Sequence, residues 1–142
     1  MKQQSDAVEP ASLDVAIRAL RHRDRTTAEL DERLAAQGID AAERERALET
    51  LERIGYVDDE RFARTRAEQL AGRGSGDALI RHDLGRRGLA TEVVEAAIDA
   101  LDPERERAVR IAEQRGRSVK TARYLASKGF SADVLDLVAP ED

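Results

Sequence analysis

A short segment recurs three times along the chain, and it constrains the fold more than any other feature. Each copy has a leucine, three further residues, a glycine and a large apolar residue, as LAAQGI, LGRRGL and LASKGF. The glycines of the three copies are Gly38, Gly88 and Gly129, and the spacings between them are 50 and 41 residues. Such a period is typical of helical repeat modules.

The glycine in each copy is expected to end a helix. Glycine adopts the left-handed conformation at a helix C-terminus without a steric penalty, and the apolar residue after it then folds back onto the helix. A new helix is expected to begin at Asp40, at Ser131, and at either Ala90 or Thr91. Two Ser/Thr/Asp-x-x-Glu patterns, Thr26 with Glu29 and Asp40 with Glu43, predict capping boxes. Asp102 before Pro103 predicts another start, with the proline at the first helical position.

Apolar residues at helical spacing extend this pattern to nine helices, and no segment alternates as a strand would. The stripe Ala47, Leu48, Leu51 and Ile54 is one example. We therefore predict an all-α protein, an elongated tandem array of three three-helix repeats. The helices are expected at about 12–22, 27–37, 41–54, 59–71, 76–87, 91–101, 103–115, 119–128 and 132–138. The repeats are expected at 12–57, 58–102 and 103–138, between a disordered tail at 1–11 and a flexible end at 139–142.

Composition agrees with a thin core and a large wetted surface. Hydrophobic residues make up 41% of the chain, aromatic residues only 3%, and charged residues 37%, against about 25% charged in an average globular domain. Without cysteine there are no disulfides or thiolate metal sites. No apolar run approaches the ~20 residues that span a bilayer, and the N-terminus lacks the apolar core of a secretory signal. We expect a cytoplasmic monomer that does not contact a membrane.

The stretch GYVDDERFA, residues 55–63, raises the question of a metal or catalytic site at Asp58 and Asp59. Adjacent residues point in different directions on a helix, so spacing favours a simpler interpretation. Gly55 ends one helix, Tyr56 crosses the gap as an apolar anchor together with the valine after it, and Asp58 caps the next helix. Asp59 then lies in the favourable first turn, and Phe62 points back to the core. A lesser alternative is an acidic contact patch.

No other catalytic or metal-binding set is apparent. The two histidines, His22 and His82, are isolated in charged helices and are expected on the surface. The glycine-rich GRGSG at 72–76 lacks the preceding strand and the following Lys-Ser/Thr of a phosphate loop, and we interpret it as a flexible joint between helices. The sequence therefore predicts no enzyme, no cofactor and no metal.

Charge is distributed unevenly and suggests distinct contact faces. Residues 1–57 carry nine basic and twelve acidic side chains, residues 58–102 carry seven and ten, and residues 103–138 carry eight and five. The last segment alone is net basic. The candidate contact residues for a partner are Arg81, Arg86, Arg87, Arg115, Arg117, Lys120, Arg123 and Lys128. Tyr124 is either a recognition anchor or, more simply, a core residue.

Three of these stretches, GYVDDERFA at 55–63, IRHDLGRRGL at 80–89 and VVEAAIDAL at 93–101, resemble the RecX family of regulatory proteins. The resemblance covers about residues 12–138, and the first stretch is its most specific part. The family often has Glu where His82 and Asp83 stand here, so that Asp83 alone keeps the acid.

The resemblance implies a non-enzymatic regulator of the RecA recombinase. Family members are tandem three-helix repeats that lie in the helical groove of the RecA filament, inhibit its ATPase and strand exchange, and so affect recombination, DNA repair and the SOS response. The implied partner is thus the RecA filament, and weak contact of the basic third repeat with single-stranded DNA stays open as an addition.

A second class of function stays open on the sequence. The stretch SVKTARYLASKGFSADVLDLV, residues 118–138, can be interpreted as a helix-turn-helix that contacts DNA directly through the basic third repeat. Its second helix would be the recognition helix, yet this helix has Asp133 and Asp136 and no Arg or Lys, which disfavours phosphate contact. A generic scaffold repeat is the remaining alternative.

Overall fold

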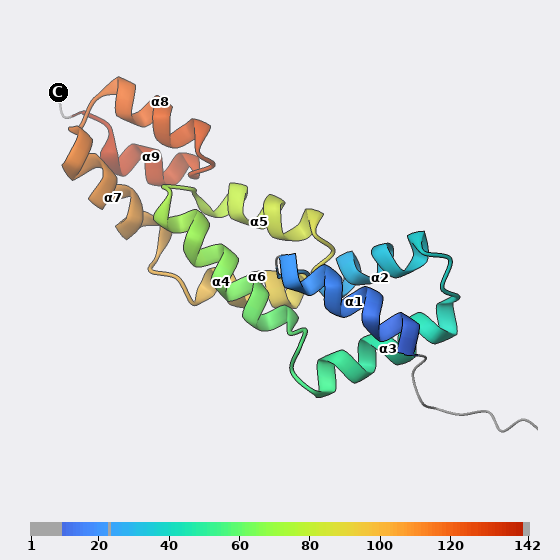
Figure 1. Ribbon diagram of the computed structural model, residues 1–142. Coiled ribbons are helices and arrows are strands. Elements are labelled where there is room, and N and C mark those ends of the chain that lie inside the picture. The colour runs from blue at the N-terminus through green and yellow to red at the C-terminus, as the bar shows by residue number, and fades with distance from the viewer. Residues whose placement is uncertain (1–9, 23, 141–142) are drawn as a thin grey trace, which may run out of the picture. The chain divides into compact units, whose positions relative to one another are not determined.

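The structure, a computed structural model, describes residues 10–22 and 24–140. Within these ranges the chain is all-helical and has no strand, which confirms the predicted fold class (Figure 1). The helices are α1 (Pro10–His22), α2 (Thr27–Ala36), α3 (Ala41–Arg53), α4 (Asp59–Gly72), α5 (Asp77–Arg86), α6 (Thr91–Asp99), α7 (Glu104–Arg115), α8 (Val119–Ser127) and α9 (Ala132–Val138).

The helix ends lie within two residues of the predicted ones. The first helix begins at Pro10 and so takes in two residues of the expected N-terminal tail. The rest of that tail, the last two residues of the chain and the expected surface position of the His22 side chain lie outside what the structure describes. The number of repeats and the elongated shape stay predictions.

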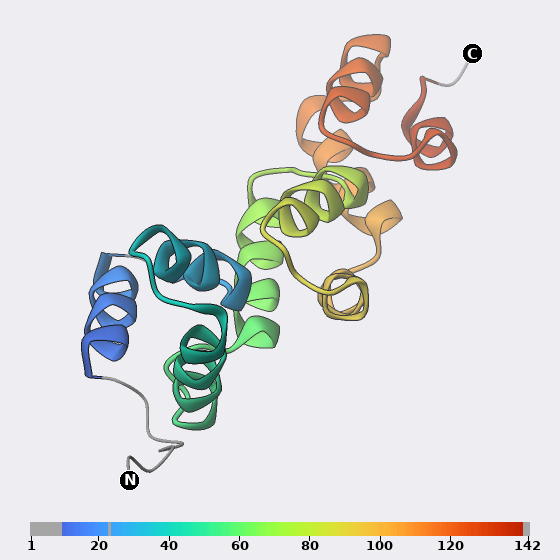
Figure 2. The same ribbon diagram turned by 90° about the vertical axis from the view of Figure 1, so that its right-hand side faces the viewer.

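The chain divides into two compact units, called unit 1 and unit 2 below. Unit 1 contains the described residues up to Phe62 together with Arg87–Leu89, and unit 2 contains Ala63–Arg86 and the residues from Ala90 onward. In unit 1, helices α1, α2 and α3 pack against one another (Figure 2). Their shared core consists of Ala16, Ala19, Leu30, Leu34, Ala47, Leu51 and Val57.

Unit 2 has its own core between α7, α8 and α9, and α5 packs against α6. The residues of this core are Ala108, Ala112, Leu125, Phe130, Val134 and Val138. Small and branched side chains dominate both cores because aromatic residues are so few. The helices therefore approach closely through alanines.

The helix starts are set by side-chain caps, largely as predicted. Thr26 and Glu29 form a reciprocal capping box at α2, and the Asp40 carboxylate accepts the N–H of Glu43 at α3. Ser131 caps α9. Of the two candidates at α6, Ala90 is the N-cap, and it has no side-chain hydrogen bond there.

The expected start at Asp102 with Pro103 in the helix is wrong by one residue. Pro103 is the N-cap of α7, with φ −51° and ψ 142°, and so lies outside the helix. Asp102 has other partners, because its carbonyl accepts a hydrogen bond from Arg107 and its carboxylate one from Arg110.

The three repeat glycines have positive φ angles of 80°, 82° and 87° at Gly38, Gly88 and Gly129. Leu89 and Phe130, which follow the second and third, are 7% and 5% exposed. Each leucine-glycine copy therefore forms a turn with an apolar residue directed into a core.

Candidate functional site

The acidic pair at the start of α4 has two structural roles. Asp58 caps its own helix, because its Oδ1 accepts the backbone N–H of Arg61 at 3.0 Å. Asp59 reaches the start of α2, where its Oδ1 accepts the N–H of Thr27 at 2.8 Å and its hydroxyl at 3.0 Å. The second role could not be predicted from the sequence, because Thr27 lies 32 residues away from Asp59 and no local pattern links the two.

Two side chains near this pair differ from their expected positions. Tyr56, expected as an apolar anchor, is 54% exposed, and Ile54, expected in a buried stripe, is 55% exposed. Val57 takes the buried position at 2% exposure. In this turn the N–H groups of Tyr56 and Val57 both donate to the carbonyl of Leu51, and it is the side chain of Val57 that is buried.

Phe62 is half-buried, and a cation rather than the core covers its ring. The Arg87 guanidinium carbon lies 5.5 Å from the ring centroid, a distance typical of a cation–π contact. Arg87 Nη1 also lies 3.4 Å from Glu29 Oε2. Arg87, a sequence candidate for partner contact, is thus 19% exposed and engaged within unit 1.

The turn that contains Arg87 and Gly88 packs against the start of α2. Thr26 Oγ1 donates a 2.7 Å hydrogen bond to the carbonyl of Arg87. A Cβ atom placed on Gly88 would lie 2.5 Å from the Cβ of Ala28. Glycine is therefore required at this position both for its φ angle and for the close approach of the helix α2 start.

Unit 2 also has a carboxylate at one helix start that accepts the N–H at the start of an earlier helix. Glu104, the first residue of α7, accepts the N–H of Asp77, the first residue of α5, at 2.7 Å, and the N–H of Ser131 at 2.9 Å. The N–H of Gly76 donates a 2.7 Å hydrogen bond to the carbonyl of Lys128. Glu104 therefore ties the start of α7 to the starts of α5 and α9 within unit 2.

The glycine-rich GRGSG segment belongs to this contact and is not a flexible joint. A Cβ on Gly76 would lie 2.5 Å from backbone atoms of Gly129 and Phe130. Ser75 is 2% exposed, and its carbonyl accepts a hydrogen bond from Arg107. The segment is therefore closely packed, although its composition is typical of a flexible loop.

Arg107 is a structural residue that the sequence did not distinguish from its charged neighbours. It is 8% exposed, bonds to the Asp77 carboxylate at 2.9 Å, and lies over the Phe130 ring with its guanidinium carbon 5.9 Å from the centroid. Removing one partner of such a buried pair leaves an uncompensated charge.

The candidate contact residues on α5 are partly paired. Arg81 forms a bidentate pair with Glu95, with distances of 2.8 and 3.0 Å. That hydrogen bond lowers the pKa of Glu95 and raises the pKa of Arg81. Arg86 is 69% exposed and lies 3.9 Å from Asp83. Asp83 in turn forms two 3.1 Å hydrogen bonds with Arg66, so the acid singled out in the sequence holds α4 to α5.

The candidates of the basic third segment fall into two groups. Arg115 stacks on Tyr124, with its guanidinium carbon 3.6 Å from the ring centroid, and Lys128 is half-buried. Tyr124 itself packs against the unit 2 core, in agreement with the simpler alternative. Arg115, although exposed, is thus in contact with Tyr124, and Lys128 is partly buried.

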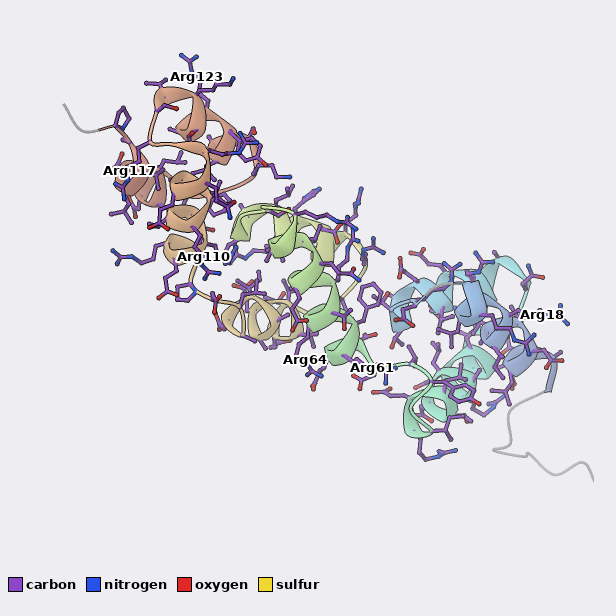
Figure 3. All side chains as sticks on the ribbon, turned by 60° about the vertical axis from the view of Figure 1, so that its left-hand side comes forward. Arg18, Arg61, Arg64, Arg110, Arg117 and Arg123 are labelled. Carbon is purple, nitrogen blue, oxygen red and sulfur yellow. The ribbon has the colours of Figure 1, made fainter. Side chains whose placement is uncertain are left out.

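The second group is more available. Arg117 donates a hydrogen bond to the carbonyl of Leu137 on the surface. Lys120 and Arg123 on α8 are exposed and have no ion pair with any residue that the structure describes. Figure 3 shows that Arg117 and Arg123 point in different directions, so the candidates do not converge on one point.

Two further observations concern chemistry and membranes. Within residues 10–22 and 24–140, no cluster of three or more His, Cys, Asp or Glu side chains is arranged to hold a metal ion. In the same residues, every helix is too short or too polar to cross a membrane.

Comparison with known proteins yields one consistent group. A family model described as RecX, second three-helix domain, matches residues 58–98. The regulatory protein RecX of Halorhodospira halophila (strain DSM 244 / SL1) is 30% identical over 140 residues, a match that covers 92% of this chain and 87% of the relative. The regulatory protein RecX of Syntrophotalea carbinolica is 35% identical over 137 residues, which covers 84% of this chain and 88% of the relative.

A solved structure shares the fold. The crystal structure of RecX from Lactobacillus salivarius superimposes with a TM-score of 0.77 at 19% sequence identity, and the match covers 90% of this chain and 92% of that one.

Proposed function

Because the chain belongs to the RecX family of regulatory proteins, we propose that it binds the RecA recombinase filament and inhibits its ATPase and strand-exchange activities. The observation that carries the proposal is the likeness to regulatory RecX proteins over more than four-fifths of the chain. A regulator of this kind acts by binding and needs no catalytic group of its own.

The contacts within each unit favour a binding role. The charged side chains near the helix starts of unit 1, notably Asp59, Glu29 and Arg87, are engaged in the fold. Lys120 and Arg123 are exposed on α8 and belong to the net basic segment. We propose that this basic surface, with Arg117, contacts acidic groups of the filament.

The tandem arrangement supports a second step of the proposal. A RecA filament is periodic, and three similar helical groups in series could each contact a successive subunit. Weak contacts linked along one chain gain affinity through effective concentration. The division into three repeats at 12–57, 58–102 and 103–138 is part of this proposal, as are a monomeric state and a cytoplasmic location.

One experiment tests the function directly. Purified protein is added to RecA filaments assembled on single-stranded DNA, and the rate of ATP hydrolysis is followed. We expect the rate to fall as the protein concentration rises. An unchanged rate at saturating concentration would contradict the proposal.

Direct binding of nucleic acid through α8 and α9 is the second candidate, and the exposed Lys120 and Arg123 favour it. The two functions differ in what they require. A DNA-binding module would bind bare single-stranded DNA as tightly as the RecA-coated strand, with a steep loss of affinity at rising salt. A RecA regulator would bind the coated strand far more tightly.

A further inference from the structure

Four glycine turns in the described part of the chain share one backbone pattern. In each, the residue after the glycine donates its N–H to the carbonyl of a buried leucine five residues earlier. The four donors are Ile39, Tyr56, Ser75 and Phe130. In such turns this residue ordinarily packs back onto its helix.

Three of the four residues follow that rule. Ile39 packs against the unit 1 core, and Ser75 and Phe130 are 2% and 5% exposed. Tyr56 is 54% exposed. The neighbouring Val57 fills the inward position that Tyr56 would otherwise occupy, and so the largest side chain of this turn is held outside the core.

The turn that presents Tyr56 is firmly held. Tyr56 N–H bonds to Leu51 at 2.9 Å, and Arg61 Nη2 donates a 3.3 Å hydrogen bond to the carbonyl of Gly55 (Figure 3 shows Arg61 at the start of α4). Ile54, 55% exposed, directly precedes the glycine and is a second exposed apolar side chain of this turn. A tyrosine on a fixed backbone loses little conformational entropy on binding, and tyrosine is enriched among the residues that dominate protein interfaces.

Several other residues of the stretch GYVDDERFA stabilise the fold. Gly55 has a φ of +82°, Asp58 caps α4, and Asp59 holds α2. Of its aromatic residues, Phe62 is covered by Arg87. The Tyr56 side chain has no hydrogen bond or cation–π contact with any residue that the structure describes.

Charge around the turn indicates the kind of partner. Residues 49–61 carry five acidic and two basic side chains, and one of the two basic ones, Arg61, is hydrogen-bonded to the carbonyl of Gly55 in the turn itself. Glu52 and Glu60, on either side of Tyr56 in the chain, are both exposed. Such an acidic surround repels the phosphates of a nucleic acid, whereas it complements basic side chains on a protein.

We propose that Tyr56 and Ile54 are the apolar anchor by which unit 1 binds the RecA filament, with Tyr56 entering an apolar pocket of RecA that is bordered by basic side chains. This rests on the function proposed above and assigns the contact residues. Tyr56 makes the main contact, and Glu52 and Glu60 orient the approach.

The test is a titration of N-terminally labelled protein with RecA filaments on single-stranded DNA, followed by fluorescence anisotropy. Tyr56→Ala is expected to weaken binding about tenfold or more, whereas Tyr56→Phe keeps the ring and stays near wild type. Both variants should melt at the wild-type temperature because the Tyr56 side chain is about half exposed to solvent. If Tyr56→Ala lowers the melting temperature, Ile54→Ser replaces it as the test variant.

A charge variant separates a protein partner from a nucleic acid. The double change Glu52→Lys and Glu60→Lys is expected to weaken binding to RecA filaments and to strengthen binding to bare single-stranded DNA. If the change strengthens binding to both, or if Tyr56→Ala weakens both equally, the anchor contacts nucleic acid and the inference is wrong.

The wild-type titration distinguishes this inference from the function on which it rests. Wild-type binding that Tyr56→Ala and Ile54→Ser leave unchanged would overturn the anchor and leave the regulator function standing. A wild-type protein that does not bind RecA filaments would overturn both.

Discussion

Asp59 and Glu104 occupy equivalent positions and make the same contact. Each is the first residue of its helix, and each carboxylate accepts the N–H of the first residue of an earlier helix, Thr27 for Asp59 and Asp77 for Glu104. The first N–H groups of a helix have no partner within it. An acid at the start of α4 or α7 therefore satisfies a donor that lies 32 or 27 residues earlier.

Replacing Asp59 with alanine should destabilise unit 1. The change removes both hydrogen bonds to Thr27 and leaves that N–H without its acceptor, and we expect a loss of about 1–2 kcal/mol in the free energy of unfolding. Urea unfolding followed by circular dichroism measures it. Glu68→Ala, an exposed change in the middle of the same helix, should stay within about 0.5 kcal/mol of wild type. Equal losses in the two variants would contradict the role of Asp59.

Replacing Gly88 with valine should destabilise the protein more than the same change at Gly38. Both glycines have φ near +80°, so both variants carry the strain of a branched residue in the left-handed region. Only at Gly88 does the new Cβ meet another atom, the Cβ of Ala28 at 2.5 Å, whereas at Gly38 nothing lies within 4 Å. We expect a difference of about 1–3 kcal/mol in unfolding free energy. Equal melting temperatures would show that the turn does not lie against α2.

A pair of alanine variants tests the packed GRGSG segment. Gly76→Ala would place a methyl group 2.5 Å from the backbone of Gly129 and should destabilise unit 2 by about 1–3 kcal/mol. Gly85→Ala lies within α5 where no atom approaches within 4 Å, so it should be neutral or stabilise by about 0.5–1 kcal/mol. The melting temperatures of the two variants, measured by circular dichroism, test this difference in stability. A flexible joint at 72–76 would tolerate Gly76→Ala as easily as Gly85→Ala.

The helices could be predicted from the sequence because their determinants are local. The two residues of the capping box, Thr26 and Glu29, are three positions apart, and the leucine and the apolar residue of the leucine-glycine pattern are five positions apart. Each such signal lies within one helix and its next turn. Local signals of this kind agree at most of the helices, and this explains why the predicted boundaries lie within two residues of the observed ones.

The contacts that complete the site are not local. Thr26 and Arg87 are 61 residues apart, and Arg107 and Ser75 are 32 apart. Nothing near Arg87 in the sequence distinguishes it from a surface cation, and it was therefore predicted to be a contact residue.

The exchange of the buried position between Tyr56 and Val57 has another cause. Both are apolar and adjacent, and only the turn geometry selects which one enters the core.

The pairing of Glu95 with Arg81 predicts a pH dependence. The hydrogen bond from Arg81 holds the pKa of Glu95 below its ordinary value of 4.5. A carboxyl whose folded pKa is lowered contributes stability above its unfolded pKa, and this is lost as the pH falls through the folded pKa. The stability difference between wild type and Arg81→Met should thus be present at neutral pH and shrink below about pH 4. An NMR titration of Glu95 should show its pKa rise in Arg81→Met.

Reversing Arg117, Lys120 and Arg123 to glutamate tests the basic surface of unit 2. Their side chains are exposed, and within residues 10–22 and 24–140 only Arg117 has a hydrogen-bond partner for its side chain, the carbonyl of Leu137. The triple variant should therefore keep its helicity and lose no more than about 1 kcal/mol of stability. Inhibition of RecA ATP hydrolysis should need roughly tenfold or more protein, because acidic groups would then face acidic groups.

Arg87→Glu is the matched control for this variant, because it also reverses a candidate arginine but in a different environment. Arg87 covers Phe62 and pairs with Glu29, so its reversal should lower the melting temperature and weaken inhibition only as far as unfolding does. The two variants thus separate stability from binding. If the triple variant inhibits RecA as strongly as wild type, the basic surface does not contact the filament, and the anchor at Tyr56 would have to supply the affinity from unit 1.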